Sequence, residues 1–329
     1  MDSLSQVVLG AITFALVKDK EIGKKSLVYG AVLGTIPDLD VLLNPFFDSV
    51  EQLAIHRAFS HSIFFSIILS LLAAKILSKK YNSSYISWVW ACFVALFTHP
   101  LLDICTTYGT RILYPLTKSY YSLNNVFVVD LGFTLPLLIA TIALWIMKNK
   151  NPKRSKIINI SLIISTGYLV WGLIVREIVY HKFETILQEK SIVYEKMNVA
   201  PTPFNTFLWQ VIIKTNDGFY LSDYSIFDKE MNPTFYFEKS ENQLLPKLEK
   251  RPELEPFFNF AQGFGLVKKE GDLIKIYVTK FGPMTSDKKG PKFAFPMCIK
   301  PDGSYYALQN PPKNYDEILN KLWIRVQGK

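Results

Sequence analysis

Long apolar runs fill the first 176 residues of the chain. Four of these runs hold about 16 to 22 mostly apolar residues, close to the roughly 20 that an α-helix needs to cross a bilayer. They are residues 62–77, 86–105, 126–147 and 157–175. Two earlier stretches, 4–17 and 26–43, are shorter or interrupted by Pro37, and they predict a shallow helical hairpin or a tilted pair. Residues 1–176 are therefore expected to form an α-helical polytopic membrane domain.

The pattern changes after residue 176, where aromatic and charged residues mix and turn signals recur. Stretches of strand-like composition cover residues 209–214, 235–239 and 273–278. Turns are predicted at Asn216-Asp217-Gly218, Glu270-Gly271-Asp272 and Pro301-Asp302-Gly303. Residues 244–251 and the segment from Tyr315 are expected to be helical. Residues 177–329 therefore predict a mainly β (α+β) soluble domain.

The net charge of +9 would suit a nucleic-acid-binding protein. The basic residues, however, stand beside the apolar runs and form no basic face interleaved with aromatic residues, so no nucleic-acid partner is expected. The loops 18–25, 75–80 and 148–156 carry 12 lysines and arginines, whereas the loops 44–61 and 106–125 carry three. Basic loops stay on the cytoplasmic side of a membrane. We therefore expect a multi-pass protein of a bacterial-type inner (plasma) membrane, with an extracytoplasmic C-terminal domain.

Three of the four histidines lie in two short stretches, each at the end of an apolar run. His99 and Asp103 are spaced i, i+4, so on a helix they share one face and can bind one ion. His56 and His61 are spaced i, i+5, and both reach one centre only if the next helix begins between them. Two carboxylates follow Pro37, which disrupts the helix there. The predicted ligands of a divalent metal, with zinc as the expected ion, are His56, His61, His99, Asp103 and Asp38.

These residues, together with the family resemblance given below, predict a membrane-bound metal-dependent hydrolase acting on a phosphoester or lipid-type substrate at the outer membrane face. A bound metal would lower the pKa of a water molecule toward about 7 and polarise the scissile group. Arg57 would neutralise a phosphoryl oxygen, and Asp40 could act as the general base. Asp2 and Gln6 are expected to line the same site, Ser60 to cap the helix that begins near His61, and Asp130 to cap the fifth helix or support the site.

Two other classes of protein share some of these features. A transporter or proton relay also carries ionisable groups in its helices, but it would distribute them through the depth of the membrane. A non-catalytic interaction protein would use the outer β domain for binding, and its metal would only brace the helices. The lipid bilayer and a lipid or phosphoester substrate are the expected partners in the hydrolase interpretation.

Several short motifs together resemble the YdjM-type, or LexA-binding, family of inner-membrane metal-dependent hydrolases. They are Met1-Asp2-Ser3-Leu4-Ser5-Gln6, Pro37-Asp38-Leu39-Asp40, His56-Arg57, Ser60-His61-Ser62, His99-Pro100-Leu101-Leu102-Asp103, Thr106-Thr107-Tyr108-Gly109-Thr110 and Pro201-Thr202-Pro203-Phe204-Asn205. The family is distantly similar to zinc-dependent phospholipase C and related zinc nucleases, whose metal sites use His and Asp. The resemblance therefore implies a phosphoester-type substrate. Those soluble enzymes use more histidines than the membrane part of this chain contains, so a full trinuclear cluster is not implied.

Cysteine labelling of intact cells tests the topology. Single cysteines placed in residues 106–125 and in the C-terminal domain should react with a membrane-impermeant maleimide, because the distribution of basic residues puts these segments outside. Cysteines placed in residues 148–156 should be protected. The reverse pattern would contradict both the topology and the outward-facing site.

Overall fold

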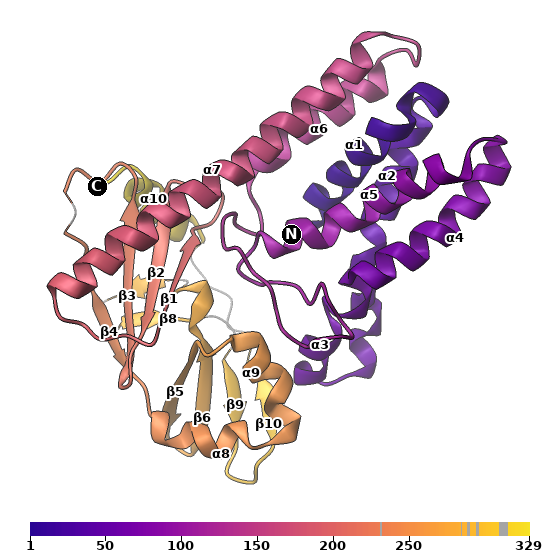
Figure 1. Ribbon diagram of the computed structural model, residues 1–329. Coiled ribbons are helices and arrows are strands. Elements are labelled where there is room, and N and C mark those ends of the chain that lie inside the picture. Colours follow the sequence, from indigo (N-terminus) through magenta and orange to yellow (C-terminus); the bar gives the residue numbers. More distant parts are fainter. Residues whose placement is uncertain (231, 284, 288–289, 294–295, 309–314) are drawn as a thin grey trace. The chain divides into compact units, whose positions relative to one another are not determined.

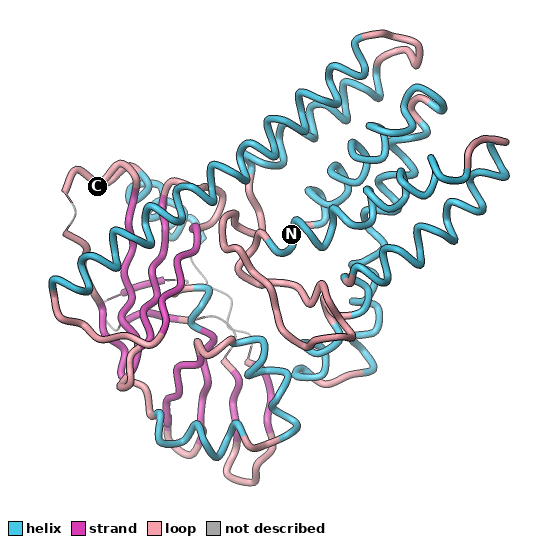
Figure 2. Tube along the Cα trace, in the orientation of Figure 1, coloured by secondary structure: helices cyan, strands magenta, loops and turns pink. Residues whose placement is uncertain are grey.

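A computed structural model describes residues 1–230, 232–283, 285–287, 290–293, 296–308 and 315–329. Helices make up the N-terminal part of the chain, and the strands all follow them (Figure 2). The chain forms two compact units. The first contains Met1–Phe47 and Ala54–Leu173, and the second contains Asp48–Leu53 and Ile174–Lys329. The helix α7 (Lys153–Glu189) contributes to both units. The predicted fold class, a helical membrane region followed by a domain with β-sheets, is confirmed.

The N-terminal part consists of helices joined mostly by short connections, apart from the long segment 105–130 between α5 and α6 (Figure 1). Its elements before α7 are α1 (Ser3–Ile22), α2 (Lys25–Thr35), the 3-10 helix η1 (Ile36–Phe46), α3 (Ser49–Ile55), the short 3-10 helix η2 (Phe59–His61), α4 (Ile63–Tyr81), α5 (Tyr85–Ile104) and α6 (Leu131–Ile146).

Within the described residues, three helical segments are long and apolar enough to cross a membrane. They are Lys25–Phe46, Tyr85–Ile104 and Lys153–Glu189. Ser49–His61 and Ile63–Tyr81, which meet at a bend of 50°, provide a fourth if they form one broken span. Three of these segments correspond to the predicted runs 62–77, 86–105 and 157–175. The segment Lys25–Phe46 was predicted only as part of a shallow hairpin or tilted pair, and the run 126–147 contains only the shorter apolar helix Leu131–Ile146.

The helix α6 is shorter than the apolar run 126–147 predicts. It has 16 residues and begins at Leu131. The Asp130 side chain accepts a hydrogen bond from the Gly132 N–H (2.9 Å), which fixes the start of the helix there. The helix therefore begins directly after Asp130, within the apolar run, and the predicted capping role of Asp130 is confirmed.

Glycines allow α1 and α2 to pack with their backbones in contact. A Cβ atom on Gly30 would overlap the carbonyl oxygen of Gly10 and would lie 2.6 Å from Phe14 Cβ. A Cβ atom on Gly34 would lie 2.8 Å from the Gln6 carbonyl oxygen. Gly30 and Gly34 have the four-residue spacing that brings helices close together in membranes. This contact turns the two predicted shallow segments into a tightly packed hairpin.

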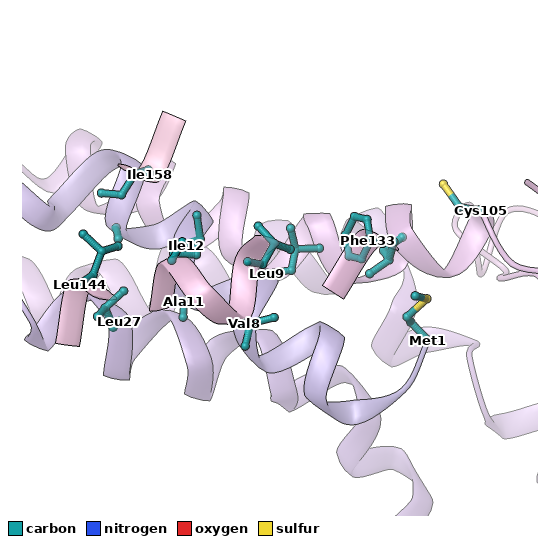
Figure 3. Packing of buried hydrophobic residues seen from close by; sticks show 14 of the residues in the cluster. Met1, Val8, Leu9, Ala11, Ile12, Leu27, Cys105, Phe133, Leu144 and Ile158 are labelled. Carbon is teal, nitrogen blue, oxygen red and sulfur yellow. The ribbon is translucent and has the colours of Figure 1, made fainter. Parts of the chain in front are cut away.

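Apolar side chains of α1 form the centre of the helical core. Figure 3 shows Val8, Leu9 and Ile12 of α1 in one cluster with Phe133 of α6 and Ile158 of α7. A second cluster joins α1 to α2, α4 and α5 through Phe14, Leu33, Ala74, Trp88 and Cys92. The two clusters therefore pack α1 against the other long helices of this unit.

The basic loops gather at one end of the first unit. Buried Arg154 donates from Nε to both carboxylate oxygens of Asp19 (3.1 and 2.9 Å), which connects the 148–156 loop to the 18–25 loop. Ser83, just beyond the 75–80 loop, donates a hydrogen bond to Glu21 (2.6 Å). The three loops with the most basic residues therefore lie together, as the alternation of charge along the chain predicts.

The second unit contains two four-stranded antiparallel sheets. The first has the order β1 (Lys196–Pro201), β2 (Leu208–Lys214), β3 (Gly218–Ser225), β4 (Tyr236–Lys239). The second has the order β10 (Tyr305–Ala307), β9 (Met297–Ile299), β6 (Leu273–Val278), β5 (Gly265–Glu270). A small hairpin pairs β7 (Thr285–Asp287) with β8 (Gly290–Lys292). The helical elements are η3 (Asn242–Leu244), α8 (Leu245–Glu249), η4 (Pro252–Leu254), α9 (Glu255–Ala261), η5 (Thr279–Phe281) and α10 (Tyr315–Val326).

The first sheet packs against the C-terminal half of α7 (Figure 1). Val179 and Phe183 of α7 share an apolar cluster with Val199, Trp209 and other buried strand residues. The predicted strands 209–214 and 273–278 lie within β2 and β6, and the predicted strand 235–239 contains β4. The three predicted turns join β2 to β3, β5 to β6, and β9 to β10. The predicted helix from Tyr315 is α10, and α8 lies within the predicted helix at 244–251.

A Gly30→Ala substitution should destabilise the helical unit. The added methyl group would meet backbone atoms of α1, and overpacking of this kind costs about 1–3 kcal/mol. Thermal unfolding of the detergent-purified protein should show a lower Tm. Gly167→Ala is the matched control, because a Cβ atom at Gly167 has no described atom within 4 Å. An equal effect of the two substitutions would contradict the close packing of α1 and α2.

Candidate metal centre

Four buried or half-buried side chains converge at one end of the helical unit. Asp38, His61, His99 and Asp103 each offer one ligand atom, and these four atoms all lie within 4.8 Å of one another. The Nε2 atoms of His61 and His99 are 3.2 Å apart, and Asp38 Oδ1 lies 3.3 Å from each of them. Asp103 Oδ2 lies 3.3 Å from the His61 Nε2 atom and 3.6 Å from that of His99. Four of the five predicted ligands are therefore brought together.

Three separate elements supply these side chains. His99 and Asp103 stand one turn apart near the end of α5, as their spacing predicts. Asp38 lies in η1, after Pro37, and His61 ends η2 just before α4 begins at Ile63. The helix α4 therefore begins after His61 and not between His56 and His61, where the prediction required a helix start. Only the short 3-10 helix η2 begins between the two histidines, and only His61 is among the converging residues.

The cap of α4 differs from the prediction. The Ser62 hydroxyl accepts a hydrogen bond from the Phe65 N–H (3.1 Å), so Ser62 is the cap. Ser60 instead donates a hydrogen bond to Asp40 Oδ2 (2.8 Å). The prediction failed because both serines precede the helix, and the tertiary contact with Asp40 decides which of them is free to cap it.

Contacts outside the centre orient both imidazole rings. His99 Nδ1 lies 2.6 Å from the carbonyl oxygen of Gly34, which can only accept, so Nδ1 carries the hydrogen. His61 Nδ1 lies 2.9 Å from Ser60 Oγ and 3.4 Å from Asp40 Oδ2. Because the Ser60 hydroxyl hydrogen goes to Asp40, Ser60 accepts from His61 Nδ1. A ring with its hydrogen on Nδ1 and none on Nε2 would direct the Nε2 lone pair into the centre, as metal-binding histidines require.

The residues present fit a divalent cation. The two Nε2 atoms lie 3.2 Å apart, and buried Asp103 Oδ2 has no hydrogen-bond partner among the described residues. A cation between these atoms would satisfy all of them at once. Two imidazole nitrogens and two carboxylate oxygens form a donor set that suits zinc and other divalent first-row metals.

The second oxygen of Asp103 is held by donors from other elements. Asp103 Oδ1 accepts a hydrogen bond from Gln6 Nε2 (3.1 Å) and from the α-amino group of Met1, and Arg57 Nη2 lies 3.3 Å away. Gln6 therefore lies at the site, as its position in the chain predicts. Asp2 caps α1 by accepting a hydrogen bond from the Ser5 N–H (3.0 Å). The role of Met1 was not predicted, although the topology places the start of α1 at this end.

The remaining predicted ligand, His56, is not one of the four converging residues, and its Nδ1 atom is paired with Asp40. His56 Nδ1 lies 2.9 Å from Asp40 Oδ1, and the other Asp40 oxygen accepts a hydrogen bond from the Arg57 N–H (3.1 Å). The His56 ring also meets the rings of His61 and Tyr108 edge to face, with centroids 5.7 and 5.6 Å apart. Asp40 thus connects the two histidines of this segment through its carboxylate.

Arg57 is buried beside the centre in a backbone conformation that is unusual for its type. Its φ is 56°, in the left-handed region that a non-glycine residue adopts only when its surroundings hold it there. The guanidinium lies over the Tyr108 ring (4.4 Å) and donates to the Gly109 carbonyl (3.3 Å). Burial raises the pKa of Tyr108. The Arg57 Nε donor has no partner within the described chain.

Replacing His61, His99 or Asp103 by alanine should lower the bound metal and the Tm. A ligand that binds only the folded state at about 100 times its Kd stabilises that state by about 2.7 kcal/mol, and this contribution would be lost. Metal analysis and thermal unfolding of the purified variants provide the measurement. His181→Ala is the control, because its side chain is 71% exposed and lies 3.2 Å from Glu184, far along α7. Full metal occupancy in a His61→Ala, His99→Ala double variant would contradict the assignment.

Comparisons with known proteins agree with the architecture. The sequence model of the family described as "YdjM inner membrane protein" matches residues 1–179. "Uncharacterized protein YfhP" of Bacillus subtilis (strain 168) is 26% identical over 231 residues, which is 67% of each chain. "Inner membrane protein YbcI" of Escherichia coli (strain K12) is 33% identical over 93 residues, which is 28% of this chain and 54% of YbcI. No solved structure matches significantly. Because the family match covers more than half of the chain and contains all four converging side chains, the chain belongs to the YdjM inner membrane protein family.

Proposed function

We propose that this protein is a membrane-bound metal-dependent hydrolase that acts on a phosphoester or lipid-type substrate at the outer face of the membrane. The observation that carries the proposal is the convergence of four metal-binding side chains beside buried Arg57. In this proposal Asp38, His61, His99 and Asp103 hold the ion, with zinc as the expected metal. A divalent ion held there supplies Lewis acidity and a water that is nucleophilic near neutral pH.

Arg57 is the proposed binding group for a phosphoryl oxygen. Its guanidinium lies 3.3 Å from Asp103 Oδ1, so a group bound at the centre would be adjacent to it. The unpartnered Nε donor is available to an anion, and the contacts with Tyr108 and Gly109 hold the planar guanidinium in place. A fixed guanidinium can stabilise the charge that develops on a phosphoryl oxygen during hydrolysis.

Asp40 and His56 are proposed to act together. The assignment of Asp40 as general base stays a prediction, since both of its oxygens already accept hydrogen bonds from neighbouring groups. Its contacts favour a positioning role, in which Asp40 orients the His61 ring and the backbone of Arg57. His56, which was predicted as a metal ligand, would support the centre through Asp40.

The lipid-type substrate is supported by the apolar surface of η1, the element that carries Asp38. Leu39, Leu42, Leu43 and Phe46 of η1 are exposed, and Phe59 of η2 is exposed as well. An apolar rim around a polar centre suits an amphiphile whose head group enters the centre while its apolar part stays in the bilayer. The distribution of basic loops supports an outward orientation for this end of the helices and an extracytoplasmic position for the C-terminal domain.

The distribution of charge also bears on the two alternatives. The ionisable side chains of α1 and α5 lie in or near their end turns, and α6 has none. A proton relay or transporter would need such groups at mid-depth. A non-catalytic protein with a bracing metal would have no need for a buried arginine with an unpaired donor beside the ion. Both features favour the hydrolase.

An Arg57→Lys variant should lose most of its turnover but keep its metal. Lysine retains the charge but lacks the planar set of donors, and removing one such donor from a reaction centre costs about 100-fold or more in rate. Hydrolysis of phospholipids, lipid phosphates and nucleotides by the detergent-purified protein provides the assay, with metal content measured in parallel. Arg176→Lys is the control for the substitution. Equal turnover by wild type and Arg57→Lys would show that Arg57 only anchors the protein at the interface.

A further inference from the structure

Three phenylalanines lie at one end of the strands of the first sheet in the second unit. Phe204 and Phe207 lie in the connection between β1 and β2, and Phe227 follows β3. Phe204 is 44% exposed and Phe227 is 53% exposed. The rings of Phe207 and Phe227 contact each other, with centroids 5.7 Å apart. Large apolar side chains gathered at one place on a surface indicate that something covers them.

The connection between β1 and β2 holds this presentation rigidly. Phe204 adopts a φ of 67°, which a phenylalanine reaches only under constraint. The Asn205 side chain supplies the constraint, because it donates to the Pro203 carbonyl (2.8 Å) and accepts from the Phe207 and Leu208 N–H groups (2.9 and 2.8 Å). These residues belong to the motif Pro201-Thr202-Pro203-Phe204-Asn205, which has no role in the metal centre.

The helix α10 lies at the same end of the strands. Val326 at its end accepts a hydrogen bond from Ser225 Oγ (2.6 Å), and Arg325 donates to both oxygens of Asp228 (2.5 and 2.7 Å). These contacts fix the end of α10 beside Phe227, and they leave Trp323 64% exposed. Ile324 is exposed as well. Phe204, Phe207, Phe227, Trp323 and Ile324 together are called the aromatic edge.

The strand ends that carry the aromatic edge lie beside the part of α7 that directly follows its apolar run. The C-terminal end of α7 lies at the opposite ends of the strands. There Ile192 N–H donates to the Leu187 carbonyl, and the residues that follow enter β1 beside Lys214. One and a half turns earlier, Lys182 donates to Tyr224 (2.6 Å), a residue at the aromatic-edge end of β3. The apolar run 157–175 precedes Lys182 in the same helix.

We propose that the aromatic edge lies in the lipid interface of the membrane in which α7 is anchored. Aromatic rings favour the level of the lipid head groups, and an exposed helix face with Trp and Ile suits the same position. The basic groups of α10 are already paired: Arg325 with Asp228, and Lys321 with Glu317 (2.6 Å). The contact is therefore apolar, and it should depend little on anionic lipid.

Depth-dependent quenching in nanodiscs that hold one copy of the full chain tests this proposal. A fluorophore is attached to Phe204→Cys or Phe227→Cys, and the native cysteines are buried. The control is Val193→Cys, because Val193 is 85% exposed and lies in the connection at the opposite end of the sheet. In phosphatidylcholine discs, lipids that carry a nitroxide near the head group should quench the two edge labels severalfold more than the control label. Aqueous iodide should show the reverse order.

Two further results decide the outcome. A Phe204→Asp substitution should reduce lipid quenching of the Phe227→Cys label severalfold, whereas Phe204→Leu should not, and added phosphatidylglycerol should change little. Equal quenching of the edge and control labels by lipid nitroxide would overturn the proposal. Edge labels that resist both quenchers in crowded vesicles but not in single-copy discs would also overturn it, because a second copy would then cover the edge.

Discussion

A carboxylate buried at the end of an apolar helical bundle is the constraint on which the first unit depends. Asp103 is fully buried, and a charge in such a place destabilises the fold by several kcal/mol unless it is paired. Gln6 and Arg57 approach one of its oxygens, and two imidazole nitrogens face the other. The start of α1, the turn around η2 and the end of α5 therefore have to meet at this point.

Spacing in the sequence was sufficient to predict much of this arrangement. His99 and Asp103 share a face because they are one helical turn apart, and the apolar run around them defined the helix that carries them. His61 joins them because a helix starts directly after it. The membrane helices and the strands β2, β4 and β6 were predictable for the same reason: a repeating pattern of apolar residues determines which element forms.

Contacts between distant segments could not be read from the sequence. Asp38 and Asp40 are two residues apart in a 3-10 helix with three residues per turn, so their side chains point in different directions and take different partners. Ser60 and Ser62 differ in role because only one of them reaches Asp40. The exposure of Phe204 was not predictable either, since an apolar residue in a short loop can be buried or exposed.

The backbone of Gly34 connects helix packing to the chemistry of the centre. Its lack of a side chain lets α1 approach, and its carbonyl oxygen fixes the ring of His99. That carbonyl is in place only once α1, α2 and α5 have packed together. A chain that is still being inserted therefore has its histidines but not their final orientation. The orientation of His99 that suits a metal therefore depends on the packing of α1, α2 and α5.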